Sequence, residues 1–348
     1  MIFNLTARAA TDSDLLSLQR TVKLLVSALA VLLLTGGAKV SAKIVELSET
    51  QLEQKLADPK SGLRGFVDLV EKSMISGEME PVEALIEQDA ILARATEGIE
   101  ARGTKVIRDL FSDSTRRNWE ESGITRDFAG TNFRFLRIRT YKDRAGLLFR
   151  SAGDHGSLNF FCFVLREAAP HDFRVIDIFT MGINEYASET LRRTYCHLAA
   201  SLLGEDGRKF TKDNGAYVDS IEAVAAISQQ LKAGAWEDVL NSAAVLPPAV
   251  KSERSVLLMR LKAAENYSVT SRAKVIEDWL KAFPDEMDLP LKLADHYITG
   301  ERWDDAERVV KRLLDRTGGD ARLYLQLGNI NFRRERDQRL MQSAASRN

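Results

Sequence analysis

The chain has 348 residues, of which 45% are hydrophobic and 28% charged, and its 49 basic and 50 acidic side chains give a formal net charge of −1. At ~100–200 residues per domain, this length predicts two or three domains. The composition is that of an ordinary globular protein, which excludes disordered, collagen-like and many-span membrane chains. The charge lacks the basic excess typical of nucleic-acid-binding proteins, so we expect no nucleic-acid partner.

Residues 20–42 have the three-part layout of a secretory signal peptide. Two basic residues precede an apolar run over 24–34, and the small residues Val-Ser-Ala end the segment. The run is shorter than the ~20 residues that cross a bilayer. We predict a signal peptide over 1–42, Lys43 as the first mature residue, a periplasmic or secreted location, and no stable membrane span after cleavage. A buried core helix and a short membrane anchor are the alternatives.

The predicted leader begins in an unusual way. The segment before residue 20 is long and contains Asp12 and Asp14, which indicates a start codon assigned too far upstream. Residues 1–42 carry four basic and two acidic side chains, so their removal changes the net charge from −1 to −3. We therefore expect a mildly acidic mature protein.

Helical patterns come first in the predicted domain 43–205. Phe66, Val70 and Met74 recur at helix spacing, and Gly77 stands where a C-terminal cap belongs. Pro81 suits the first turn of a second helix. The short apolar stretch 91–95 suggests a strand. Thr104 offers an N-cap for a third helix.

The pattern then changes to strands. The segments 132–141, 146–151, 157–166 and 173–183 are rich in aromatic and β-branched residues and are separated by short polar turns, which predicts an antiparallel meander. The third segment is apolar on both faces, so we expect it to be a central strand. A closing helix follows over 184–203.

Helices followed by a curved antiparallel sheet predict an α+β fold. The order of elements over residues 62–200 resembles the NTF2-like (ketosteroid-isomerase-like) cone, in which three helices lie on the sheet. The segments GEMEPVEALIEQDA and RVIDIFTMGINEYASETLRR are similar to parts of such domains. The resemblance implies a pocket between sheet and helices, and it allows a homodimer through the sheet.

Asp177 is the best candidate for chemistry in this cone. It alternates with Val175 and Phe179 on one face of an apolar strand, so its burial requires a partner or a function. Arg150, on a neighbouring strand, is the expected partner. A structural pair or a backbone-bonded aspartate is the favoured reading, and a general base in a ligand pocket is the alternative.

No other catalytic or metal-binding pattern is present. The four histidines are far apart in sequence, and the zinc-binding, serine-hydrolase and phosphate-loop motifs are missing, so we expect no metal and no cofactor. Two cysteines exclude a disulfide scaffold. Cys162 and Cys196 lie on a predicted strand and on the closing helix. A single disulfide between them and two separate buried thiols both remain open.

A predicted linker over 206–218 leads to a helical region, 219–337, which is followed by a polar tail, 338–348. The region is self-similar at about 34 residues, the period of tetratricopeptide (TPR) repeats. The segments ARLYLQLG and ADHYITGERWDDAERVV resemble that family in their aromatic, glycine and alanine positions. Stacked repeats of this kind would form an all-α domain after the cone.

The resemblance to TPR repeats also implies a concave groove that binds peptides or protein segments. Mapped on the family pattern, the inward-facing positions include Asp288, Asp295, Arg322, Asn329 and Arg333. Basic and amide side chains suit an acidic segment, although the same residues would also make an ordinary solvated face.

These patterns favour an exported, non-enzymatic interaction protein. Its repeats would bind a protein partner, while the cone would serve as a spacer, dimerisation unit or ligand sensor. The alternative is a small-molecule-binding protein or enzyme with its site in the cone. A third reading has the repeats cap the cone, so that the chain forms one rigid unit.

Overall fold

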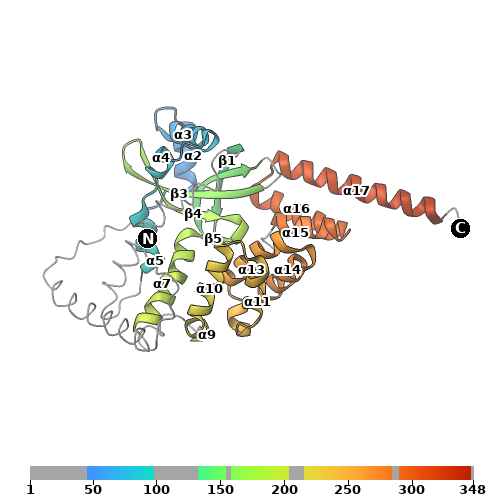
Figure 1. Ribbon diagram of the computed structural model, residues 1–348. Helices are drawn as coiled ribbons and strands as arrows, with labels where there is room; N and C mark the ends of the chain where they lie inside the picture. The colour runs from blue at the N-terminus through green and yellow to red at the C-terminus, as the bar shows by residue number, and fades with distance from the viewer. Residues whose placement is uncertain (1–44, 98–131, 154–157, 204–214, 284–289, 346–348) are drawn as a thin grey trace.

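The structure is a computed structural model that describes residues 45–97, 132–153, 158–203, 215–283 and 290–345. In this part of the chain, a five-stranded antiparallel sheet lies between a small group of N-terminal helices and a larger group of C-terminal helices (Figure 1). The predicted α+β class is therefore confirmed. The predicted signal peptide lies outside the described residues.

Within the described residues, four helices precede the sheet. They are α2 (Glu49–Ala57), α3 (Leu63–Ser76), α4 (Glu80–Glu83) and α5 (Gln88–Thr96). A capping box between Ser48 and Gln51 begins α2. The helix predicted around Phe66 is α3, and it ends at Gly77, whose φ of 78° suits glycine. Pro81 lies in the first turn of α4, as the sequence predicts.

The segment around residue 91 is a helix, so the strand suggested for 91–95 is wrong. Ile91, Leu92 and Ala95 are buried on one side of α5, which packs against α7 (Ala187–Leu203). A four- or five-residue apolar run fits either a buried strand or one side of a short helix, and tertiary contacts decide between them. The helix predicted from Thr104 lies outside the described residues.

The sheet is a meander, as the sequence predicts. Its strands pair antiparallel in chain order and are β1 (Asn132–Tyr141), β2 (Arg144–Ala152), β3 (Leu158–Ala169), β4 (Asp172–Thr180) and β5 (Glu185–Tyr186). Lys142 and Asp143 both have positive φ, which allows the tight turn between β1 and β2. β3 is central and buried on both faces, which confirms the expectation from its apolar pattern.

Side chains alternate across the sheet and so enter two different cores. Phe149, Phe161 and Phe163 pack with the N-terminal helices. Phe160 and Cys162 lie on the opposite face, in a core that also contains side chains of the C-terminal helices. Both faces of the central strand are thus covered by this chain.

The C-terminal region is helical. It comprises α9 (Gly215–Asp219), α10 (Ile221–Lys232), α11 (Trp236–Ala244), α12 (Pro248–Lys251), α13 (Arg254–Tyr267), α14 (Val269–Ala282), α15 (Pro290–Thr299), α16 (Trp303–Thr317) and α17 (Ala321–Ala345). The short helix α9 overlaps the end of the predicted linker, and α17 continues through most of the predicted polar tail.

Three helical hairpins repeat in this region: α10–α11, α13–α14 and α15–α16. Their turns lie at Gly234, Ser268 and Glu301. These positions are about 34 residues apart, as the self-similarity of the sequence predicts. Gly234 and Glu301 adopt positive φ values of 73° and 55°, so the first and third hairpins reverse direction in a similar way.

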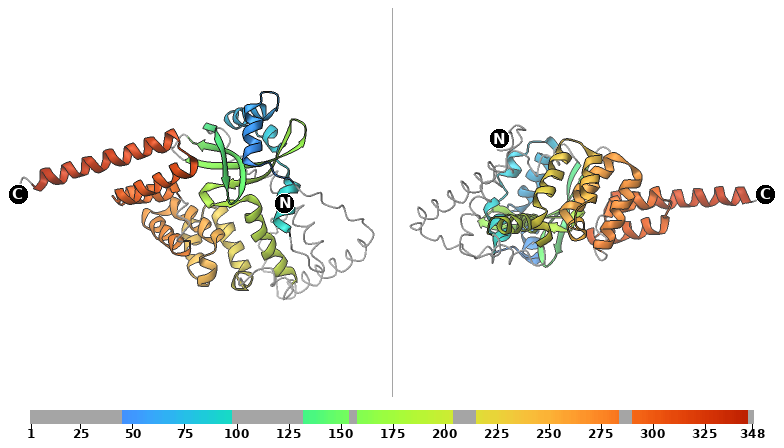
Figure 2. Two further views of the ribbon diagram at one scale, coloured as in Figure 1. Left: turned by 180° about the vertical axis from the view of Figure 1, so that it is seen from behind. Right: turned by 60° about the horizontal axis from the view of Figure 1, so that its bottom comes forward.

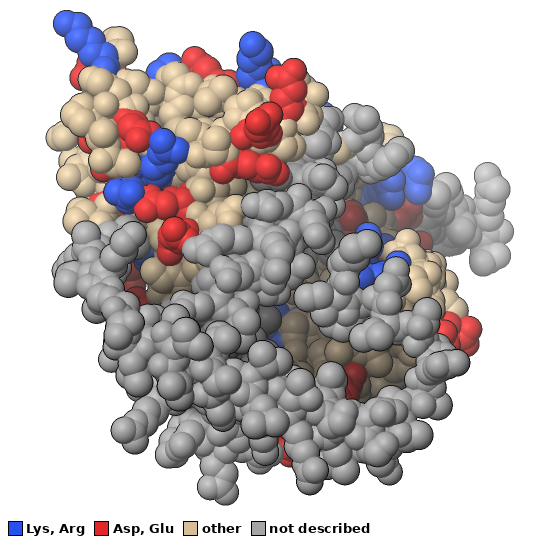
Figure 3. All heavy atoms as spheres, turned by 60° about the vertical axis from the view of Figure 1, so that its left-hand side comes forward, with Lys and Arg blue, Asp and Glu red and all other residues tan. Residues whose placement is uncertain are grey.

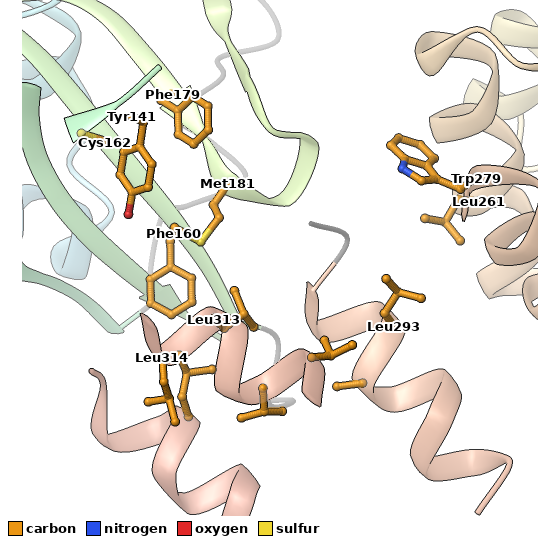
Figure 4. Close-up of a cluster of buried hydrophobic side chains, with 14 of the residues drawn as sticks. Tyr141, Phe160, Cys162, Phe179, Met181, Leu261, Trp279, Leu293, Leu313 and Leu314 are labelled. Atoms are coloured by element: carbon orange, nitrogen blue, oxygen red, sulfur yellow. The ribbon is translucent and has the colours of Figure 1, made fainter. Parts of the chain in front are cut away.

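One hydrophobic core joins the sheet to the hairpins. Phe160 and Met181 point toward Leu313 and Leu314 of α16 (Figure 4). The same cluster extends through Trp279 into α14. The sheet and the hairpins therefore share a hydrophobic core.

The last helix extends beyond this unit. α17 begins beside the sheet and its far end projects away from the other helices in every view (Figures 1 and 2). On the face drawn in Figure 3, acidic and basic side chains are intermixed over the described surface. Among the described helices, none is both long and apolar enough to span a membrane.

Candidate functional site

Asp177 is sealed inside the protein and fully bonded. Its carboxylate pairs with Arg144 at 2.6 Å and accepts hydrogen bonds from the Ser188 hydroxyl and from the backbone N–H groups of Ser188 and Ile178. The side chain has no solvent exposure. Arg144 also pairs with Glu46 and stacks on the ring of Tyr186. Such an arrangement holds β2, β4 and α7 together and leaves no room for a substrate at Asp177.

Arg150 is not the partner of Asp177, and the expected pair is wrong. Arg150 lies opposite Phe160 on β3, whereas Asp177 lies opposite Val164. The two side chains are therefore four strand positions apart, about 13 Å along the sheet. Arg150 instead pairs with Asp320 at 2.7 Å. The registers of β2 and β4 on β3 fix this distance, and these registers cannot be read from the sequence.

Both cysteines are free thiols. Cys162 is buried in the sheet, where its thiol lies 3.7 Å from the carbonyl oxygen of Arg139, and Cys196 is buried on α7. Burial raises the pKa of both thiols above the ordinary range. Of the two alternatives left by the sequence, the structure has the separate thiols.

A pocket of about 490 Å³ lies between the C-terminal helices and the sheet. Its walls come from α14, α15 and α17, and Ala152 and Leu158 close it from the adjoining ends of β2 and β3. Four of the five residues predicted to line a groove are here: Asp295, Arg322, Asn329 and Arg333. Asp288 lies outside the described residues.

One face of α17 forms the longest wall. Leu323 and Ile330 are buried in the core, and they fix the rotation of α17 about its axis. This rotation determines which side chains of the helix line the pocket. Arg322, Asn329 and Arg333 lie seven and four positions apart, which places them on one side of a helix with 3.6 residues per turn. The resemblance to TPR repeats implied that these three residues face inward, and the structure places them together on one face of α17.

Three arginines give the pocket a basic character. The side chains of Arg272, Arg322 and Arg333 line it, and within the described residues none of the three has an ion-pair partner closer than 4 Å. The Nε atom of Arg272 is buried and has no hydrogen-bond partner in the described part of the chain. An unmatched buried donor costs about 1–3 kcal/mol, so this cluster favours a ligand that accepts hydrogen bonds.

Arg272, Ala152 and Leu158 are pocket residues that the sequence reasoning missed. Arg272 lies on α14, the second helix of its hairpin, whereas the family pattern directs attention to first helices. Ala152 and Leu158 belong to the sheet, and only the docking of the helices on the sheet brings them to the pocket. In the sequence, the feature that could have pointed to Arg272 is its position four residues after the turn of a repeat.

Asp295 is the acidic group of the pocket. Desolvation by the surrounding protein raises the pKa of its carboxyl, with a smaller contribution from Glu265, while Arg272 acts in the opposite direction. The neighbouring His296 shows the reverse shift: burial and the charges of Arg272 and Arg302 lower its pKa. Among the described residues, the pocket lining combines three arginines with one aspartate.

The start of α17 is fixed to the sheet. Asp320 accepts a hydrogen bond from the backbone N–H of Arg322 at 2.9 Å, and its other oxygen pairs with Arg150. Arg137 of β1 donates to the carbonyl oxygens of Gly318 and Gly319, next to the C-terminus of α16. These contacts hold the first turn of α17 against the sheet, so that Arg322 and Leu158 line the same pocket.

Comparisons with known proteins give no match: no family model, no curated protein and no solved structure matches this chain. Within the described residues, His, Cys, Asp and Glu side chains nowhere gather in threes as metal ligands would. The candidate site is therefore argued from its own geometry and charge.

Proposed function

We propose that this chain is an exported, non-enzymatic interaction protein whose pocket between α14, α15 and α17 binds an acidic segment of a protein partner. The observation that carries the proposal is a group of three arginines around a pocket of about 490 Å³, none of which has an ion-pair partner among the described residues. Guanidinium groups form strong, charge-assisted hydrogen bonds with carboxylates. The volume lies in the range of about 300–1,000 Å³ that is typical of ligand pockets.

In this proposal the two parts of the chain have different roles. The hairpins form a TPR-like array, supported by their ~34-residue spacing. The sheet and its N-terminal helices form an NTF2-like platform that supports the array, rather than an active site. The buried pair of Asp177 and Arg144 argues for this reading, because a sealed carboxylate with every oxygen bonded does not serve as a general base.

Export of the protein is also a proposal. It rests on the basic flank, apolar run and small-residue cleavage site of residues 20–42. Amino-terminal sequencing of protein recovered from the periplasm and the medium tests it. A mature start at Lys43 supports the proposal, and an uncleaved chain in the cytoplasm contradicts it.

The binding proposal is tested with fluorescein-labelled peptides and fluorescence anisotropy. Two peptides of equal length are compared, one containing glutamates and the other the matching glutamines. We expect the acidic peptide to bind more tightly, and we expect Arg322→Glu and Arg333→Glu to abolish that preference. Arg312→Glu is the control, because Arg312 is an exposed residue of α16 outside the pocket. Equal binding of the two peptides would refute the proposal.

A further inference from the structure

The basic groups of the pocket are divided between its two ends. Arg322 lies in the first turn of α17, close to the sheet, because Asp320 bonds both its backbone and Arg150. Arg333 lies eleven residues later on the same face of the helix. At 1.5 Å of rise per residue, the two positions are about 16 Å apart along the helix axis.

Contacts between α17 and the α15–α16 hairpin show where the outer end of the pocket lies. Arg334 pairs with Asp304 at 3.2 Å, so this part of α17 lies beside the first turn of α16. The end of α15 lies at the same level, because a short turn joins Thr299 to Trp303. Arg333 therefore shares the outer end of the pocket with Thr299.

Arg272 belongs to this outer end as well. It lies just after the turn at Ser268, and the turns of successive hairpins fall at equivalent positions of the repeat. Its charge also acts on Asp295 and His296 of α15. The outer end thus has two arginines and one aspartate, whereas the sheet end has Arg322 alone, since Asp320 neutralises Arg150.

The wall between the two ends is apolar and amide in character. Leu325 and Ile298 line it together with Gln326 and Asn329. Aliphatic side chains offer contacts to an aliphatic residue, and amides bond to a peptide backbone. An extended chain rises about 3.3 Å per residue, so about five residues cover the 16 Å between the two basic ends.

We propose that the ligand is an extended protein segment with two acidic side chains about five residues apart and an aliphatic residue between them. One carboxylate binds Arg322 at the sheet end, and the other binds Arg333 and Arg272 at the outer end. This inference rests on the proposed function and specifies its ligand. It differs from simple attraction of acidic chains because it requires a fixed spacing.

The test uses twelve-residue peptides of identical composition, acetylated and amidated so that their termini carry no charge. Each has one leucine and two glutamates, and the glutamates are one, five or ten residues apart. We expect the five-residue spacing to bind about tenfold more tightly than the others, since a second charged hydrogen bond contributes about 1.5 kcal/mol or more. Arg322→Ala removes this advantage, and Arg312→Ala leaves it unchanged.

A single-glutamate peptide separates the two ends. We expect Arg333→Ala to weaken its binding and Arg322→Ala to leave it nearly unchanged, because the outer end has the larger basic cluster. Binding that depends on acidity but ignores spacing overturns this inference and leaves the proposed function standing. Binding no stronger than that of the glutamine peptide overturns both. Displacement of the peptide by an equal concentration of free glutarate shows a small-acid site and overturns the inference of a protein segment.

Discussion

Arg150 of β2 and Asp320, which precedes α17, form an ion pair of 2.7 Å that ties the sheet to the last helix across 170 positions of sequence. Asp320 is 1% exposed at its side chain and Arg150 is 12% exposed. The pair determines where α17 begins, and therefore where Arg322 meets the pocket. It makes the sheet part of the candidate binding site.

We predict that Asp320→Ala destabilises the protein by about 3 kcal/mol, because it leaves a largely buried guanidinium without a partner and removes a helix cap. Asp320→Asn should cost less, since the amide oxygen still caps α17. Urea unfolding measures both changes. The control is Glu335→Gln, which breaks an exposed pair with Arg339 and should change stability by less than about 1 kcal/mol. Equal effects for Asp320→Ala and Glu335→Gln would contradict the proposed role of the pair.

Asp177→Asn tests whether that carboxylate is structural. Removing its charge leaves Arg144 partly unpaired, so we expect a loss of about 2–3 kcal/mol in the free energy of unfolding. Peptide binding at saturating protein should stay unchanged, because the pocket lies elsewhere. Asp143→Asn is the matched control: it lies in an exposed turn with positive φ, which asparagine also accepts. Stability like that of Asp143→Asn would show that the network around Asp177 is dispensable.

Two glycines of the last hairpin and helix should respond in opposite directions to alanine. Gly318 has a φ of 72°, and a methyl group there would meet the guanidinium groups of Arg137 and Arg139. We expect Gly318→Ala to destabilise the protein by about 1–2 kcal/mol. Gly328 lies inside α17 with nothing within 4 Å of an added methyl group, so Gly328→Ala should stabilise it by about 0.5–1 kcal/mol. Thermal unfolding of both variants provides the comparison, and shifts of the same sign would contradict it.

Binding of an acidic peptide should strengthen as the pH falls from neutral through the raised pKa of Asp295. The pKa of Asp295 is raised, so its carboxylate takes up a proton at a higher pH than an ordinary aspartate. Once Asp295 is protonated, it no longer repels an acidic ligand. Ordinary glutamates of the ligand keep their charge down to about pH 4.3. Asp295→Asn should bind tightly at pH 7 and lose this pH dependence. A rise in affinity that persists in Asp295→Asn would assign it to another group.

The same shift has a consequence for stability. Because the folded-state pKa of Asp295 is higher than its unfolded value, protonation favours the folded state. This contribution is present at low pH and is lost as the pH rises through the raised pKa. Unfolding experiments on Asp295→Asn across that window should therefore show a flatter stability profile than the wild-type chain.

The sequence predicts what depends on local periodicity and turn chemistry. The strand 132–141 was predicted with its observed ends, because alternation stops at a polar turn that accepts positive φ. The groove residues of α17 were implied by the resemblance to TPR repeats, and their positions on one helical face agree with the spacing of 3.6 residues per turn. The burial of Asp177 agrees with the prediction, but the expected strand face is only partly correct. A bulge at Ile176 places Val175 on the opposite face of the sheet from Phe179.

The features that the sequence did not predict depend on tertiary contacts. The partner of Asp177 is Arg144, because the registers of β2 and β4 on β3 place Arg150 four positions away along the sheet. The partner of Arg150 is contributed by a turn 170 residues later. Leu158 lines the pocket only because the helices pack against this end of the sheet, and no local pattern contains that information.

The central claim, that an acidic segment occupies the pocket, is tested most directly by photocrosslinking. p-Benzoylphenylalanine is placed at Leu325, which lines the pocket, or at Tyr324, which does not, and these adjacent side chains are 59% and 60% exposed. With the labelled peptide whose glutamates are five residues apart, we predict a crosslink from position 325 that excess unlabelled peptide suppresses, and little from position 324. Equal crosslinking from both positions, or none from position 325, would contradict the account.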